Sequence, residues 1–92
     1  MARGGIRVRV WSCWLERMIE FPRSKDGLIG ALEEYYGQGL YSLRINPEDG
    51  IATLRVPQID LAGWIGERGR IVSTLSSILE VSRVKIVGIS LN

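Results

Sequence analysis

Near the start of the chain, apolar and polar residues alternate with a period of two, which is typical of a β-strand. The apolar members of this alternation are Ile6, Val8 and Val10. Residues 12–21 are ambiguous, because their apolar side chains fit one face of a helix as well as a strand. We favour a strand or a hairpin for residues 5–21, as an extra N-terminal β segment.

A helix followed by a hairpin is predicted for the middle of the chain. Ser24 is a suitable N-cap, and the apolar residues after it recur at the spacing of one helical face. These residues are Leu28, Ile29, Leu32, Tyr35 and Tyr36. Gly37 is expected to end the helix. Residues 41–46 and 52–56 then alternate around a turn signal of Pro, Glu, Asp and Gly at 47–50, which predicts an antiparallel hairpin.

Two helices and a final strand are predicted for the last third of the chain. A short helix is expected over residues 59–65, with Asp60 as its possible N-cap. Residues 71–79 repeat the helical spacing, and residues 83–91 are rich in β-branched side chains, which favours a strand. Because helices connect this strand to the strand over 52–56, these two strands should be parallel.

The last predicted strand is apolar on both faces. Val84 and Ile86 point one way, whereas Val87, Ile89 and Leu91 point the other way. A strand of this kind is usually covered on both sides, and the helices can cover only one. We therefore expect the N-terminal segment, a second chain, or both to cover the other side.

Composition limits the class of protein. The chain has 92 residues, of which 46% are hydrophobic and 24% are charged, a balance that suits one small globular domain. We divide it into an N-terminal β extension, 1–23, and a main domain, 24–92. With no His and one Cys, a Ser-His type triad, a Cys/His metal site and a disulfide framework are excluded within one chain.

Nothing in the sequence resembles a catalytic constellation, so we expect a protein that is not an enzyme and has no cofactor or metal. No apolar run approaches the length of a membrane span, and no signal peptide is evident. The expected setting is therefore the reducing cytoplasm, with no membrane partner.

Charge is distributed unevenly along the chain. Residues 1–25 carry a net charge of +4, residues 26–59 carry −3 and residues 60–92 carry +1, which gives +2 in total. A net charge this small does not by itself argue for nucleic acid. The basic residues lie towards both ends, however, so a basic face can form where the ends fold together.

The segment that carries chemistry joins the two predicted helices. It reads Ile65-Gly66-Glu67-Arg68-Gly69-Arg70-Ile71-Val72. The two glycines can take a positive φ and let another backbone approach, and the turn presents the N-terminus of the next helix with its free N–H groups. The two arginines add cationic donors. A phosphodiester backbone is the natural occupant, although the glycines also suit a tight helix-turn-helix with solvated arginines.

This segment resembles the I-G-x-x-G-x-x-[IV] signature of KH domains, and the element order over 24–92 resembles the type II, prokaryotic arrangement of that family. The resemblance implies a three-stranded mixed sheet packed on three helices, and non-enzymatic binding of single-stranded RNA. In KH domains the GxxG loop holds the backbone of about four nucleotides, and the bases lie in an apolar groove. By position, the implied RNA contacts are Ile65, Gly66, Glu67, Arg68, Gly69, Arg70, Val72, Arg83 and Lys85, with Val84 and Ile86 in the groove or its floor.

Two residues of this region leave alternatives open. Glu67 departs from the commonest KH pattern, because its carboxylate either opposes a phosphate or faces away and pairs with Arg70. Trp64 would stack on a base if its side chain points outward.

An alternative function is assembly, in which a KH-like fold serves as a dimerisation subunit of an RNA-processing or tRNA-modifying complex. The interface would combine the apolar face of Val87, Ile89 and Leu91 with the Trp-rich N-terminus. The helix sequence at 75–79 partially resembles that of the small dimeric subunit of the KEOPS complex, a family that lacks the GxxG. Either function is compatible with a homodimer or a larger ribonucleoprotein assembly.

Overall fold

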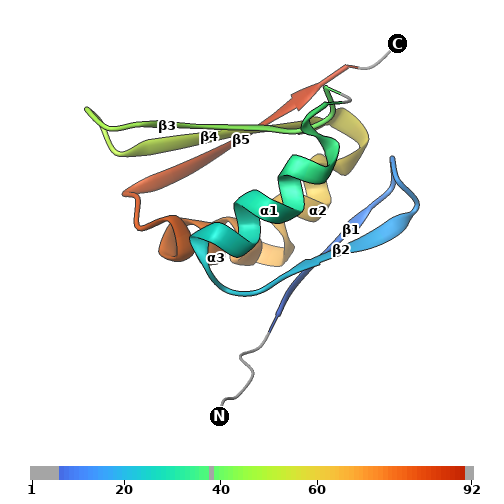
Figure 1. Cartoon of the computed structure of the whole chain (residues 1–92), viewed down its shortest axis with the longest axis horizontal. Coiled ribbons are helices and arrows are strands. Elements are labelled where there is room, and N and C mark those ends of the chain that lie inside the picture. The colour runs from blue at the N-terminus through green and yellow to red at the C-terminus, as the bar shows by residue number, and fades with distance from the viewer. Residues whose placement is uncertain (1–6, 38, 91–92) are drawn as a thin grey trace.

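The computed structural model of the chain describes residues 7–37 and 39–90 and has the mixed α/β fold predicted from the sequence (Figure 1). The strands are β1 (Val8–Ser12), β2 (Arg17–Phe21), β3 (Ser42–Asn46), β4 (Ile51–Pro57) and β5 (Arg83–Ile89). The helices are α1 (Lys25–Tyr36), α2 (Leu61–Ile65) and α3 (Arg70–Leu79), and single 3-10 turns, Gln58–Asp60 and Glu67–Gly69, precede α2 and α3.

The strands form two separate sheets. The antiparallel hairpin β1–β2 is one of them, and the other has the order β3-β4-β5. In the second sheet β3 and β4 are antiparallel, and β4 and β5 are parallel, as the sequence predicts. Figure 1 shows the three helices lying between the three-stranded sheet and the hairpin. The chain is therefore built in three layers.

The start of α1 follows from local hydrogen bonding. The backbone of Ser24 is extended, and its side-chain Oγ accepts a hydrogen bond from the Gly27 N–H at 3.0 Å. This geometry confirms Ser24 as the N-cap. Leu28, Leu32 and Tyr35 then follow at helical spacing and are buried. Through this face α1 packs on the core.

Trp64 lies at the centre of the core that the three layers share. Its side chain is 0% exposed, so it does not point outward, which was the condition for stacking on a base. α2 turns the ring inward, where it stacks on Phe21 of the hairpin at 6.3 Å between centroids and meets Tyr41 at 5.8 Å. The indole N–H has no acceptor among the described residues. Trp64 thus stabilises the fold through burial and ring contacts.

Asp60 connects the hairpin to the main sheet and to α2. Its carboxylate is 1% exposed and accepts hydrogen bonds from the Ser12 hydroxyl at 2.6 Å and from the Tyr41 hydroxyl at 2.7 Å. The backbone N–H of Trp14 donates to its second oxygen at 3.0 Å. The prediction that this side chain caps a helix is wrong, because it makes no capping hydrogen bond and instead satisfies these three donors.

The outer side of the three-stranded sheet is open. All three helices lie on its other side, and the hairpin packs beneath the helices (Figure 1). The expectation that the N-terminal segment covers the second face of β5 is therefore wrong for the described residues. Val87 and Ile89 remain partly exposed, and Leu91 lies outside the described residues, as does Ile6.

Replacing Asp60 by Ala should destabilise the protein strongly. Three donors would lose their acceptor, at roughly 1 kcal/mol each, so we expect a loss of about 3 kcal/mol in the free energy of unfolding. The measurement is urea denaturation followed by circular dichroism. Glu33→Ala, at an exposed position of α1, is the control and should change stability by less than about 0.5 kcal/mol. Equal stability of the two variants would contradict the central place of Asp60.

Stability should also fall at alkaline pH. Burial, together with the hydrogen bond to Asp60 and its charge, raises the pKa of Tyr41 above the usual 10.0, against an opposing effect of Ser12. The folded state thus holds this proton more tightly than the unfolded state, so the stabilisation is complete below pH 10.0 and is lost as pH rises further. In Tyr41→Phe the decline of unfolding free energy between about pH 9 and 11 should be shallower. If the unfolding free energy of Tyr41→Phe declined with pH as steeply as that of the wild type, Tyr41 would not be the cause of the alkaline loss of stability.

Candidate nucleic-acid interface

The loop between α2 and α3 has a left-handed backbone at three of its four residues. Gly66 has φ 78° and ψ 170°, Arg68 has φ 57° and Gly69 has φ 70°. Three backbone hydrogen bonds close the turn. The Gly66 N–H donates to Ala62 O at 2.9 Å, the Gly69 N–H donates to Gly66 O at 3.2 Å, and the Arg70 N–H donates to Glu67 O. α2 and α3 are therefore separate helices joined by a tight turn.

The two glycines are required for different reasons. A Cβ at Gly66 would lie 2.5 Å from the Ile71 side chain and 2.8 Å from its backbone nitrogen, in a backbone region essentially reserved for glycine. A Cβ at Gly69 would meet nothing within 4 Å. Gly66 thus allows the turn to close against α3, and Gly69 leaves open space beside the backbone.

The start of α3 is open to a ligand. Its N-cap, Gly69, supplies no side-chain acceptor to the first-turn N–H groups. Glu67, Arg68 and Arg70 are exposed beside it. Among the described residues Glu67 forms no ion pair with Arg70, so that alternative is wrong. Within the turn the Gly69 N–H donates to Gly66 O and the Arg70 N–H donates to Glu67 O. The turn therefore places a helix N-terminus without a side-chain cap beside two arginines, with one carboxylate that weakens the positive field.

A groove of about 570 Å³ runs along α3 to the start of β5. Val72 and Ser73 line it one turn after the loop, and Val84, which is buried, contributes to its wall. Further lining comes from Ser76, Ser77, Glu80, Val81, Ser82 and Arg83. Three serines of α3 line the groove, but most of its lining surface is apolar, as the resemblance implies.

The structure brings together only part of the predicted RNA-contact set. Residues 66–69 form the loop, Arg70 begins α3, and Val72 and Arg83 lie in the groove that begins beside the loop. Ile65 is 37% exposed but does not line the groove, and neither does Ile86, which packs on the core. Lys85 lies on the open face of the sheet, since its neighbours Val84 and Ile86 face inward.

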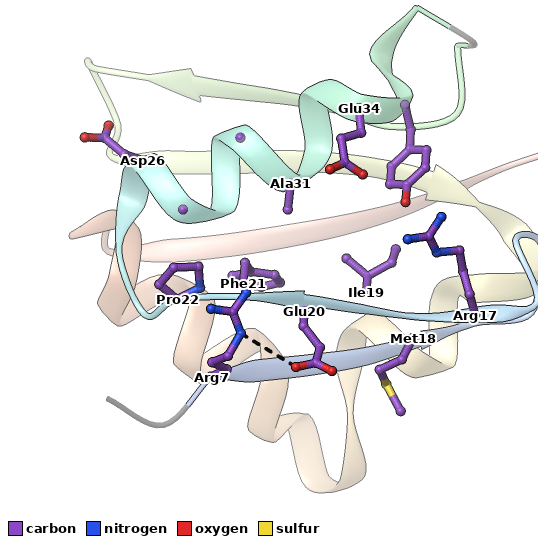
Figure 2. Close-up of a pocket in the computed structure, with 13 residues that line it drawn as sticks. Arg7, Arg17, Met18, Ile19, Glu20, Phe21, Pro22, Asp26, Ala31 and Glu34 are labelled. Carbon is purple, nitrogen blue, oxygen red and sulfur yellow. Dashed lines mark ion pairs between the residues drawn. The ribbon is translucent and has the colours of Figure 1, made fainter. Parts of the chain in front are cut away.

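A second hollow, of about 510 Å³, lies between β2 and α1 (Figure 2). Its rim carries both signs of charge, including Arg17 and Glu34, and Glu20 pairs with Arg7 at 3.6 Å. This balance gives no preference for an anion. The sequence analysis missed the hollow, although the small residues Gly27, Gly30 and Ala31 on one side of α1 are a signal for it.

The described residues contain no group of three or more His, Cys, Asp or Glu arranged to hold a metal ion. No helix of the described residues is long and apolar enough to cross a bilayer. Comparisons with family models, with curated proteins and with solved structures found no match to this chain.

The two glycines should respond differently to substitution by Ala. Gly69→Ala adds only the strain of a positive φ, and should cost about 1 kcal/mol of unfolding free energy. Gly66→Ala adds a steric clash with Ile71 and should cost about 3 kcal/mol. Thermal and urea denaturation of both variants check this order. A reversed order would contradict the loop geometry.

Proposed function

We propose that the chain binds single-stranded RNA through the loop at 66–69 and the groove that follows it, without catalysis. The observation that carries this proposal is the open, left-handed turn at an uncapped helix N-terminus, flanked by Arg68 and Arg70. Such a turn offers backbone N–H groups and a partial positive charge to a phosphate. The similarity of 65–72 to the KH signature supports the same assignment.

In this proposal the loop and the groove have separate tasks. Phosphates bind the N–H groups at the start of α3, and the two arginines neutralise their charge. The next nucleotides enter the groove, where Val72 and Val84 contact base faces and the hydroxyls of α3 serines bond base edges. Arg83, at the far end of the groove, would hold a further phosphate.

Binding of this kind should be modest in affinity. With two or three phosphates contacted, the slope of log affinity against log salt should lie between about −1.5 and −2. Strong binding would then need a second copy or a larger assembly that raises the effective concentration. Fluorescence anisotropy of a labelled oligonucleotide at several salt concentrations measures this slope.

Changing the loop to Gly-Asp-Asp-Gly, through Glu67→Asp and Arg68→Asp, tests the site directly. Aspartate tolerates the left-handed conformation at position 68, so the fold should be retained. Affinity for RNA should fall about tenfold or more, because a carboxylate replaces a cation at the phosphate. Anisotropy gives the affinity, and circular dichroism verifies the fold.

The matched control is Arg23→Asp, which changes the net charge equally at an exposed position between β2 and α1. It should weaken binding much less than the loop variant, because it acts only through the overall field. If the loop variant folds and binds RNA as well as this control, the loop is not the RNA site.

Assembly is the second candidate function, and one observation favours it. Trp11, Trp14 and Met18 are 50%, 45% and 43% exposed, and Trp11 pairs with Met18 on the side of the hairpin that faces away from the helices. The predicted interface with Val87 and Ile89 is not one surface, because the helix layer separates the hairpin from the sheet (Figure 1). An exposed apolar patch of this kind suits a protein partner.

Sedimentation velocity with and without an oligonucleotide separates the two functions. The RNA proposal predicts a complex whose sedimentation depends on the oligonucleotide. A tight dimer that is indifferent to RNA, and is lost in Trp11→Ser, would favour assembly instead.

A further inference from the structure

The open face of the three-stranded sheet carries positive charge from all three strands. Pairing places Arg44 of β3, Thr53 of β4 and Lys85 of β5 in one cross-strand row. Arg55 lies two residues along β4 from Thr53 on the same face, and Arg83 lies two residues before Lys85. All four basic side chains are exposed.

On this face Ser42, Arg44, Thr53 and Arg55, together with Leu43, line a hollow of about 360 Å³. The first four form a quartet of two arginines and two hydroxyls, in which Arg44 lies opposite Thr53 and Arg55 lies opposite Ser42. The two arginines are diagonal neighbours, at roughly 7–8 Å between backbones, so both guanidinium groups can reach one anion between them. Hydroxyl and guanidinium donors are the groups that hold a phosphate oxygen.

No carboxylate of the described residues neutralises this face. Among the described residues two ion pairs form, and both join Glu20 of the hairpin to an arginine near the start of the chain, Arg7 or Arg9. Glu48 and Asp49 lie in the turn beyond the ends of β3 and β4, and the Asp49 carboxylate accepts hydrogen bonds from Asn46 Nδ2 and from the Ile51 N–H. The four cations are therefore exposed and form no ion pair with any residue of 7–37 or 39–90.

We propose that this face binds the sugar–phosphate backbone of a single-stranded nucleic acid, with one phosphate seated in the quartet of Ser42, Arg44, Thr53 and Arg55. The charge pattern favours a polyanion, and Lys85 and Arg83 extend the cations across β5. No aromatic side chain lies among the outward residues of β3, β4 and β5, so the face contacts the backbone and does not select bases. The proposal does not depend on the loop at 66–69.

Arg83 gives this face a physical connection to the groove. It lines the groove beside α3, and it also begins β5, whose next outward residue is Lys85. A single-stranded nucleic acid that leaves the groove past Arg83 therefore reaches the open face of the sheet. The two surfaces would together contact more nucleotides than either does alone.

The test compares two double variants of the full chain that remove the same charge. Arg44→Gln with Arg55→Gln disrupts the quartet, whereas Arg23→Gln with Lys25→Gln alters exposed residues at the start of α1. The probe is a fluorescein-labelled 12-mer of uridine, titrated by anisotropy at several salt concentrations. For the quartet variant we expect roughly tenfold weaker binding and a salt slope about 0.7 smaller in magnitude, for the one phosphate contact that is lost. The control should keep the wild-type slope.

A second measurement uses the wild-type protein and so does not depend on how a variant folds. Adding the same oligonucleotide should shift the backbone amide resonances of 42–44 and 53–55 in a ¹⁵N correlation spectrum. Absence of these shifts at saturation, or equal binding by the two double variants, would overturn the proposal. Equal competition by polyglutamate would also overturn it, because the face would then accept any acidic chain.

The Gly-Asp-Asp-Gly variant distinguishes this inference from the proposed function. If the loop is not an RNA site but the open face is one, the loop variant binds like wild type while the quartet variant binds weakly. If the open face is not a nucleic-acid site but the loop is one, the quartet variant matches its control while the loop variant binds weakly.

Discussion

The buried carboxylate of Asp60 is the interaction on which the rest of the structure depends. It accepts hydrogen bonds from the hairpin, through Ser12 and the Trp14 N–H, and from Tyr41, which immediately precedes β3. A buried charge is costly unless its oxygens are satisfied, so these donors must come together for the chain to fold. Since Asp60 immediately precedes α2, the same contact fixes the helix that carries Trp64 into the core and ends at the loop.

The layered arrangement gives the molecule two outward surfaces with different chemistry. The hairpin carries Trp11 and Met18 outward, whereas the open face of the sheet carries only cations among its charged strand residues. The total charge of +2 does not reveal the positive charge of the open face, because acidic residues such as Glu33 and Glu34 lie on α1, away from that face. Folding, rather than net charge, therefore gathers the cations on one face and keeps these carboxylates away from it.

The order and type of the elements could be predicted because they depend on neighbours in sequence. Ser24 caps α1 through the N–H of Gly27, three positions away, and the turn at 47–50 is closed by Asn46 and Asp49 over two or three positions. The candidate loop was found for the same reason, since positive φ at Gly66 and Gly69 is a local requirement. The position of Lys85 away from the groove was not evident, because the face that a strand residue occupies depends on what covers the strand.

By itself, the sequence determined the periodicity, the caps and the turns, which involve hydrogen bonds and side-chain faces within a few residues. Only the tertiary structure decided which side chains are buried and which face stays open. Asp60 meets Ser12 across 48 positions and Tyr41 across 19, so no local pattern marks it as a buried acceptor rather than a helix cap. Likewise Trp64 points inward and the outer side of β5 stays open because the hairpin packs on the helices, a choice made by contacts between distant segments.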